Sequence, residues 1–150
     1  MLLFLFVAPV LLFTSCTKSI NEPGRSYSTD ITGSWYLAEA AESAGNGWNV
    51  FSTGLEKGTF TFFGDGSARY DDGYNKMTGT WTIVTLSDGY YDRYGVFHSE
   101  LHDSFRLHLR DSYTNNSVDL YFDDIIVASG NLIGTSYNGH TVNRYIFNRL

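Results

Sequence analysis

GTFTFFGDGSARYDDGYNKMTGTWTI, residues 58–83, is the stretch that decides the fold expected for this chain. Residues 59–63 are β-branched or aromatic, the types that pack well on a pleated, half-buried surface. The Asp65-Gly66 pair that follows is a strong hairpin signal, because both residues tolerate the backbone angles of a tight turn. The chain then returns, turns again and runs on to Leu86. This pattern predicts three antiparallel strands in a β-meander.

Short runs with turn signals between them continue to the end of the sequence. Phe105, Leu107 and Leu109 alternate with charged or polar residues, as in a half-buried antiparallel strand. Asn138-Gly139 is a second strong hairpin signal. Further strands are predicted at 90–101, 118–122, 125–128, 132–137 and 141–150. We expect an all-β fold, an antiparallel up-and-down barrel of about eight strands, whose interior is either filled by side chains or holds one small ligand.

The composition fits a single folded domain and excludes one class of function. A hydrophobic content of 43% is too high for a disordered chain, and 15 glycines against 2 prolines suit many strands joined by tight turns. The formal net charge is −6, and the 10 basic residues are scattered rather than clustered. Binding to nucleic acid requires clustered Lys and Arg that neutralise phosphates. Nucleic acid is therefore not an expected partner.

The N-terminal segment has the pattern of a secretory signal. Residues 2–13 form an apolar run that is too short to span a bilayer but long enough for the central region of a signal peptide. Small residues follow and lead to Cys16, the only cysteine in the chain, so no disulfide can form within it. Residues 13–16 resemble the lipobox of bacterial lipoproteins, in which the cysteine is acylated after cleavage. The resemblance implies a signal peptide at 1–15, a polar tether at 16–30 and a folded domain at 31–150. It also implies a membrane anchor through acylated Cys16 in the cell envelope, on the periplasmic face of the outer membrane or at the cell surface.

Two tryptophan motifs carry a second resemblance. Gly33-x-Trp35 opens the first predicted strand, and Gly79-Thr80-Trp81 opens a later one. Together with the Phe-rich strand and its Asp-Gly turn, they resemble the small lipocalin-like domains of bacterial lipoproteins. The resemblance implies that the first tryptophan plugs the closed end of a barrel, and the residues expected in the interior are Trp35, Phe60, Phe62 and Trp81. An unrelated antiparallel meander with aromatic pairs would show the same pattern.

The long segment between the first two predicted strands contains large apolar residues. In lipocalin-like barrels this loop overhangs the open mouth, so Trp48, Val50, Phe51 and Leu55 are the candidate gate residues for a ligand. The alternative is that these side chains pack the loop against the barrel wall, as large apolar residues in loops usually do.

No pattern in the sequence indicates catalysis, a cofactor or a metal. His98, His102 and His108 match no zinc motif, and Arg residues flank the last of them along its strand. The paired acids at 71–72 and 123–124 are adjacent, so on a strand their side chains point to opposite faces and cannot share one ion or flank one substrate bond. A nucleophile elbow and a phosphate-binding loop are both missing from the sequence.

Two binding functions remain. The first is a non-catalytic protein of the envelope that binds a small apolar or amphipathic molecule at the barrel mouth. The second is an interaction or inhibitor module with a filled barrel, which binds an envelope protein or glycan through aromatic loops such as residues 90–94. Tyrosines there either form such a patch or are ordinary strand residues.

Overall fold

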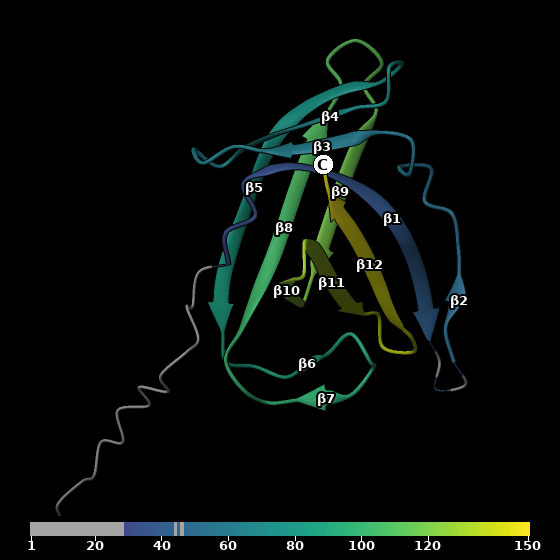
Figure 1. Cartoon of the computed structure of the whole chain (residues 1–150), viewed down its shortest axis with the longest axis vertical. Coiled ribbons are helices and arrows are strands. Elements are labelled where there is room, and N and C mark those ends of the chain that lie inside the picture. Colours follow the sequence, from purple (N-terminus) through teal and green to yellow (C-terminus); the bar gives the residue numbers. More distant parts are fainter. Residues whose placement is uncertain (1–28, 44, 46) are drawn as a thin grey trace, which may run out of the picture.

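The structure, a computed structural model, describes residues 29–43, 45 and 47–150. The proposed signal peptide, Cys16 and nearly all of the tether lie outside these residues. In the described part all regular structure is β-strand (Figure 1), and no helix long and apolar enough to cross a membrane is found there. The strands are β1 (Gly33–Ser43), β2 (Asn49–Val50), β3 (Thr59–Phe62), β4 (Ser67–Asp71), β5 (Lys76–Leu86), β6 (Tyr90–Tyr91), β7 (Phe97–His98), β8 (His102–Arg110), β9 (Ser117–Phe122), β10 (Asp124–Ala128), β11 (Asn131–Tyr137) and β12 (Val142–Arg149).

The main sheet is antiparallel and follows the chain order closely. Its strands lie in the order β10-β11-β12-β1-β3-β4-β5-β8-β9, and β2 pairs with β1 in addition. The predicted meander is confirmed, because β3, β4 and β5 pair in succession. Both hairpin signals are also confirmed, since Gly66 and Gly139 occupy turns with φ values of +82° and +93°. Strands β6 and β7 form a small separate sheet.

The expected closed barrel of about eight strands is not formed. The sheet has ten strands, and in the part of the chain that the structure describes no ladder joins β9 to β11 or β8 to β10. The two end strands are nevertheless consecutive in the chain and are separated only by Asp123. There the chain bends, and the N–H of Asp123 donates to the carbonyl of Thr135 at 2.7 Å. One continuous run therefore pairs first with β8 and then with β11, which leaves an open seam in a strongly curled sheet.

The inside of the curled sheet is filled by aromatic and aliphatic side chains. Trp35 and Phe60 have no exposed surface, and Phe62 is 2% exposed. The ring of Phe60 contacts those of Tyr70 and Phe147, at centroid distances of 4.8 and 5.5 Å. The other buried members of this core are Ile31, Leu37, Ala68, Met77, Phe105, Leu107, Leu109, Phe122, Ile125 and Leu132. The alternation predicted around Phe105 is thus confirmed, because its apolar partners Leu107 and Leu109 face inward with it.

The two motif tryptophans differ in burial. Trp35 has no exposed surface, its indole N–H donates to the carbonyl of Ile31 at 2.8 Å, and the guanidinium of Arg149 lies 5.0 Å from its ring centre. Trp81 is only partly buried: it packs against Phe62 and donates its indole N–H to the carbonyl of Phe63 at 3.0 Å. Trp81 therefore lies at the margin of the core, whereas Trp35 belongs to its centre.

Candidate functional site

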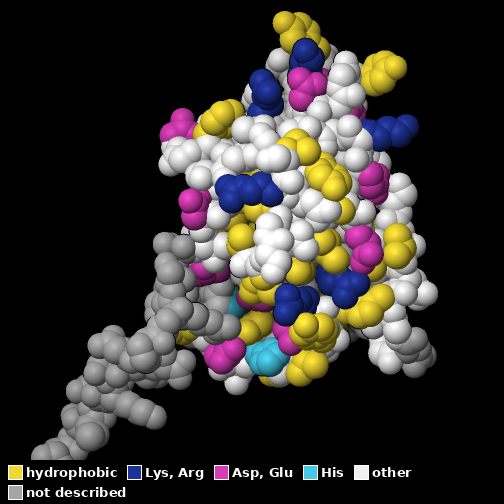
Figure 2. Space-filling view, viewed as in Figure 1, with side chains coloured by type: hydrophobic (Ala, Val, Ile, Leu, Met, Phe, Trp, Pro, Cys, Tyr) yellow, Lys and Arg dark blue, Asp and Glu magenta, His cyan; other side chains and the backbone are white. Residues whose placement is uncertain are grey.

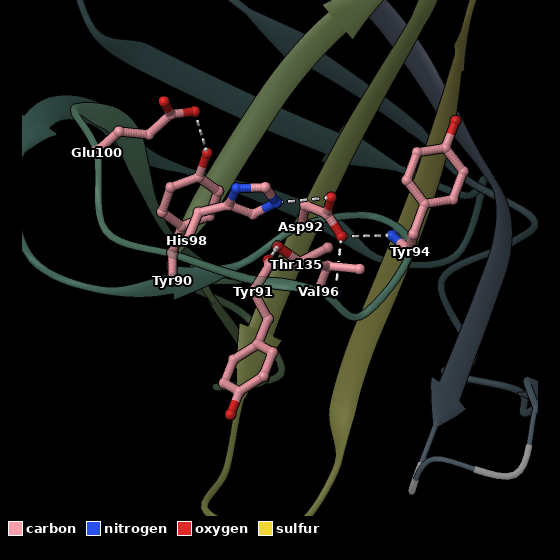
Figure 3. Close-up of polar contacts among 8 residues, drawn as sticks. All are labelled: Tyr90, Tyr91, Asp92, Tyr94, Val96, His98, Glu100 and Thr135. Atoms are coloured by element: carbon pink, nitrogen blue, oxygen red, sulfur yellow. Dashed lines mark hydrogen bonds and ion pairs between the residues drawn. The ribbon is translucent and has the colours of Figure 1, made fainter.

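The segment 90–101 was predicted as one strand, and this is wrong. It contains a small hairpin, β6 and β7, with a turn between them (Figure 3). One carboxylate oxygen of Asp92 accepts the N–H groups of Tyr94 and Val96, and the other lies 2.9 Å from Nε2 of His98. Burial opposes ionisation of this carboxyl, but the bonds from Val96, His98 and Tyr94 outweigh it and hold the pKa of Asp92 below its usual value. A charged side chain thus organises the turn.

The histidines next to this turn support the hairpin. The ring of Tyr90 lies 5.4 Å from that of His98, and its hydroxyl donates to Glu100 (Figure 3). The same ring lies 4.4 Å from that of His102. His102 pairs with Asp88 at 3.3 Å. His108 lies apart from the other two, on the exposed face of β8, where it pairs with Asp119. Within the described residues, no group of three His, Cys, Asp or Glu side chains is arranged to hold a metal ion.

The hairpin is fastened across one end of the curled sheet (Figure 1). The hydroxyl of Thr135, a buried residue of β11, donates to the carbonyl of Tyr91 at 2.5 Å. Nη1 of Arg144, on β12, donates to the carbonyl of Arg93 at 3.2 Å. The ring of Tyr91 also lies 4.6 Å from that of Tyr137. These contacts fix the hairpin over the ends of β11 and β12.

Arg144 also holds the segment that follows β1. Its guanidinium carbon lies 4.1 Å from the ring centre of Trp48, and Nη2 pairs with Glu39 of β1 at 2.9 Å. The same largely buried side chain therefore contacts β1, the Trp48 loop and the hairpin turn at Arg93. A cation stacked on tryptophan and paired with a carboxylate is a stabilising arrangement.

A cleft opens between these elements, and we call it the mouth cleft. Its volume is about 460 Å³. The large side chains that line it are Trp48, Tyr91, Tyr94, Tyr137 and His140, and the small residues are Ser43, Gly45, Gly47, Gly95 and Val142. Figure 2 shows hydrophobic side chains at this end of the molecule, with basic, acidic and histidine side chains among them. The Tyr94 side chain is 68% exposed and that of Tyr137 is 44% exposed, so the cleft presents aromatic surface to solvent.

The four candidate gate residues are not brought together. Trp48 lines the mouth cleft, whereas Val50 and Phe51 line a separate groove beside β1. The ring of Phe51 packs edge-on against Tyr145 at 6.0 Å, and Leu55 packs against the core. Phe51 and Leu55 thus fasten the loop to the sheet, and only Trp48 faces the cleft.

Replacing Arg144 with glutamine is expected to loosen both walls of the mouth cleft. The variant loses the stacking on Trp48, the ion pair with Glu39 and the bond to the Arg93 carbonyl, a loss of about 1–2 kcal/mol in the free energy of unfolding. Hydrogen exchange measured by mass spectrometry should become faster in residues 48–51 and 91–96. The matched control is Arg69→Gln, at an exposed position of β4. Unchanged exchange in both segments would contradict this role.

Comparison with protein families, with curated proteins and with solved structures gave no match for this chain. What the molecule does is therefore argued from its own residues and from the geometry of the mouth cleft.

Proposed function

We propose that this chain is a non-catalytic, lipid-anchored binding protein of the bacterial cell envelope, and that it binds a small amphipathic ligand in the mouth cleft. The observation that carries the proposal is the cleft itself. Its volume of about 460 Å³ is within the range of small-molecule sites, and it combines aromatic rings with polar groups. The filled interior favours a ligand held at this end of the sheet over one enclosed within it.

A lipocalin-like fold is part of the proposal. It is supported by the up-and-down strand order, by the pairing of the first strand with the last, and by Trp35 buried near one end of the sheet beneath Arg149. In a fold of this kind the opposite end is where a ligand enters. The mouth cleft lies at the end covered by the β6–β7 hairpin. Trp48, from the loop between β1 and β2, lines the cleft.

The proposed anchor is compatible with where the described chain starts. The N–H and hydroxyl of Thr29 both donate to the same carboxylate oxygen of Asp103, at 3.2 and 2.8 Å. Asp103 follows His102, the residue whose ring packs on Tyr90 of the hairpin. The chain therefore enters the folded domain beside the hairpin.

Apart from His140, which lines the cleft, the acidic and histidine side chains of its walls are paired with each other or with Arg144, which supports a non-catalytic role. Asp92 and His98 bind each other within the hairpin, and Glu39 is paired with Arg144. Each of these side chains stabilises a wall of the cleft. A general acid or base would instead have to reach a bound substrate.

Native mass spectrometry tests the proposed function. The full-length protein, purified in mild detergent from cells that produce it, is offered an extract of envelope lipids and metabolites. We expect a discrete small-molecule adduct that is strongly reduced in Tyr94→Ala. The matched control is Tyr113→Ala, whose side chain is 97% exposed in the turn between β8 and β9, at the other end of the sheet. An adduct-free mass for the unaltered protein would contradict the proposal.

A further inference from the structure

We propose that the ligand of the mouth cleft is a carbohydrate, bound with a pyranose ring against the rings of Tyr94 and Trp48. This inference rests on the proposed function, because it names the chemical class of the ligand for the same cleft. It follows from three properties of the cleft: how its rings are held, which polar groups surround them, and which charges lie nearby.

Tyr94 and Trp48 each have a guanidinium group close to the ring, and both side chains line the cleft. The guanidinium of Arg93 lies 4.9 Å from the ring centre of Tyr94, and that of Arg144 lies 4.1 Å from the ring centre of Trp48. In the cleft, Tyr94 is 68% exposed and Trp48 is half-buried. Because Arg144 lies on Trp48 and is itself paired with Glu39, the Trp48 ring is positioned before a ligand arrives, and little ordering of this ring is required on binding. The C–H groups of a pyranose form a flat apolar surface that fits the face of an aromatic ring.

The polar groups of the cleft suit hydroxyl groups. The phenol of Tyr137 donates to the carbonyl of Gly139 at 2.8 Å, so its oxygen is left as an acceptor. His140 adds a group that donates or accepts, and the Ser43 hydroxyl, whose oxygen accepts the N–H of Gly45 at 3.3 Å, keeps its own O–H as a donor. A Cβ atom placed on Gly45 or Gly47 would meet nothing within 4 Å, so there is open space beside these two residues. A ligand rich in hydroxyls suits this set of donors and acceptors.

Charge argues against an organic cation as the ligand. Aromatic cages favour quaternary ammonium groups when no cation competes for the rings. Here Arg93 and Arg144 already lie on the rings of Tyr94 and Trp48. The nearby carboxylates of Glu39 and Asp92 are engaged by Arg144 and His98. The lining residues themselves include no acid.

Packing argues against a long acyl chain. Such a ligand requires a deep apolar channel. The interior of the curled sheet is instead occupied by rings in mutual contact: Phe122 lies 5.1 Å from Tyr145 and 6.2 Å from Phe147, measured between ring centres. A neutral carbohydrate fits a cleft that presents aromatic rings at the surface and does not continue into the filled interior of the sheet.

Saturation-transfer NMR on the full-length protein in mild detergent tests this inference. The probes are disaccharides of glucose, galactose, mannose and N-acetylglucosamine, with tetramethylammonium and hexanoate for comparison. We expect transfer to the ring C–H protons of at least one disaccharide. Affinity should fall about tenfold in Tyr94→Ala, the loss expected for one stacked ring, while Tyr94→Phe should retain it. Tyr113→Ala is the matched control and should bind as the unaltered protein does.

Three results would overturn the inference: no disaccharide binds, binding is unchanged in Tyr94→Ala, or tetramethylammonium or hexanoate binds in place of the sugars. If the mass spectrometry above still shows an adduct that depends on Tyr94, the proposed binding function stands and only the carbohydrate is wrong. If neither experiment shows a ligand, both proposals fail.

Discussion

Replacing Phe60 with alanine is expected to lower the free energy of unfolding by about 3–5 kcal/mol, because the variant leaves a large cavity at a site with little freedom to collapse. Phe60 has no exposed surface. Its ring contacts Phe62 on the same strand, Tyr70 on β4 and Phe147 on β12. The side chain thus joins the start of the meander to the last strand of the sheet.

Urea unfolding, followed by tryptophan fluorescence, measures this loss. Phe63→Ala is the matched control, because it removes the same side chain three positions further along the chain, where the ring is 45% exposed. A substitution at such a surface position usually changes stability by about 0.5 kcal/mol or less. If both variants lose the same free energy of unfolding, the packing of Phe60 in the core contributes no more than the exposed ring of Phe63, and the expectation is wrong.

Gly79→Ala is the second variant with a large expected effect. A Cβ atom on Gly79 would lie 1.9 Å from the carbonyl oxygen of His108, which belongs to the backbone of the neighbouring strand β8. Since that oxygen is held in the ladder between β5 and β8, the two strands would have to separate locally. We expect a loss of about 3 kcal/mol, the upper part of the usual range for overpacked sites.

The control for this variant is Gly64→Ala. It makes the same change in the turn after β3, where an added Cβ would meet nothing within 4 Å and where φ is not in the left-handed region. We expect stability to be unchanged within about 1 kcal/mol, since an alanine that fits its backbone mainly restricts the unfolded chain. Calorimetry measures the stability of both variants. A Gly79→Ala protein that is as stable as Gly64→Ala would contradict the expectation.

The meander could be predicted because its signals are local. Residues 59–62 have strand-forming side chains, and Asp65 and Gly66 specify the turn within a few residues of them. The shared burial of Phe60 and Phe62 could also be predicted, because side chains two residues apart on a strand point to the same face. In such segments each residue and its immediate neighbours favour the same structure.

The hairpin at 90–101 and the open seam could not be predicted in this way. Tyrosines favour strands in general, and the turn between them depends on a carboxylate, that of Asp92, whose bonds form only in the folded hairpin. The seam depends on Asp123, where one run of residues changes its pairing partner from β8 to β11. Such a change of pairing partner depends on strands far apart in the sequence, so it produces no periodic pattern of residues near Asp123.

The mouth cleft was predicted only in pieces. Trp48 was a candidate gate residue and Tyr94 belonged to a candidate aromatic loop, but nothing local indicated that they share a cleft. Tyr137, His140 and Arg144 were not singled out, although the Asn138-Gly139 turn signal already placed the first two at a hairpin tip. Which loops meet at the end of a sheet depends on strand register, and register is not readable from one strand.

Because β1 pairs with β12, the sheet cannot be completed until β12 has been synthesised. Leu37 faces Phe147 across this ladder, although the two residues are separated by nearly the whole domain. Topologies dominated by such distant contacts fold slowly, in milliseconds to seconds, because the loop must close before the contacts form. A growing chain that still lacks β12 leaves one edge of β1 unpaired and Trp35 without its Arg149 cover. Completion of the core is therefore a late step, which requires the last strand to be synthesised and which leaves an incomplete chain open to pairing with other chains.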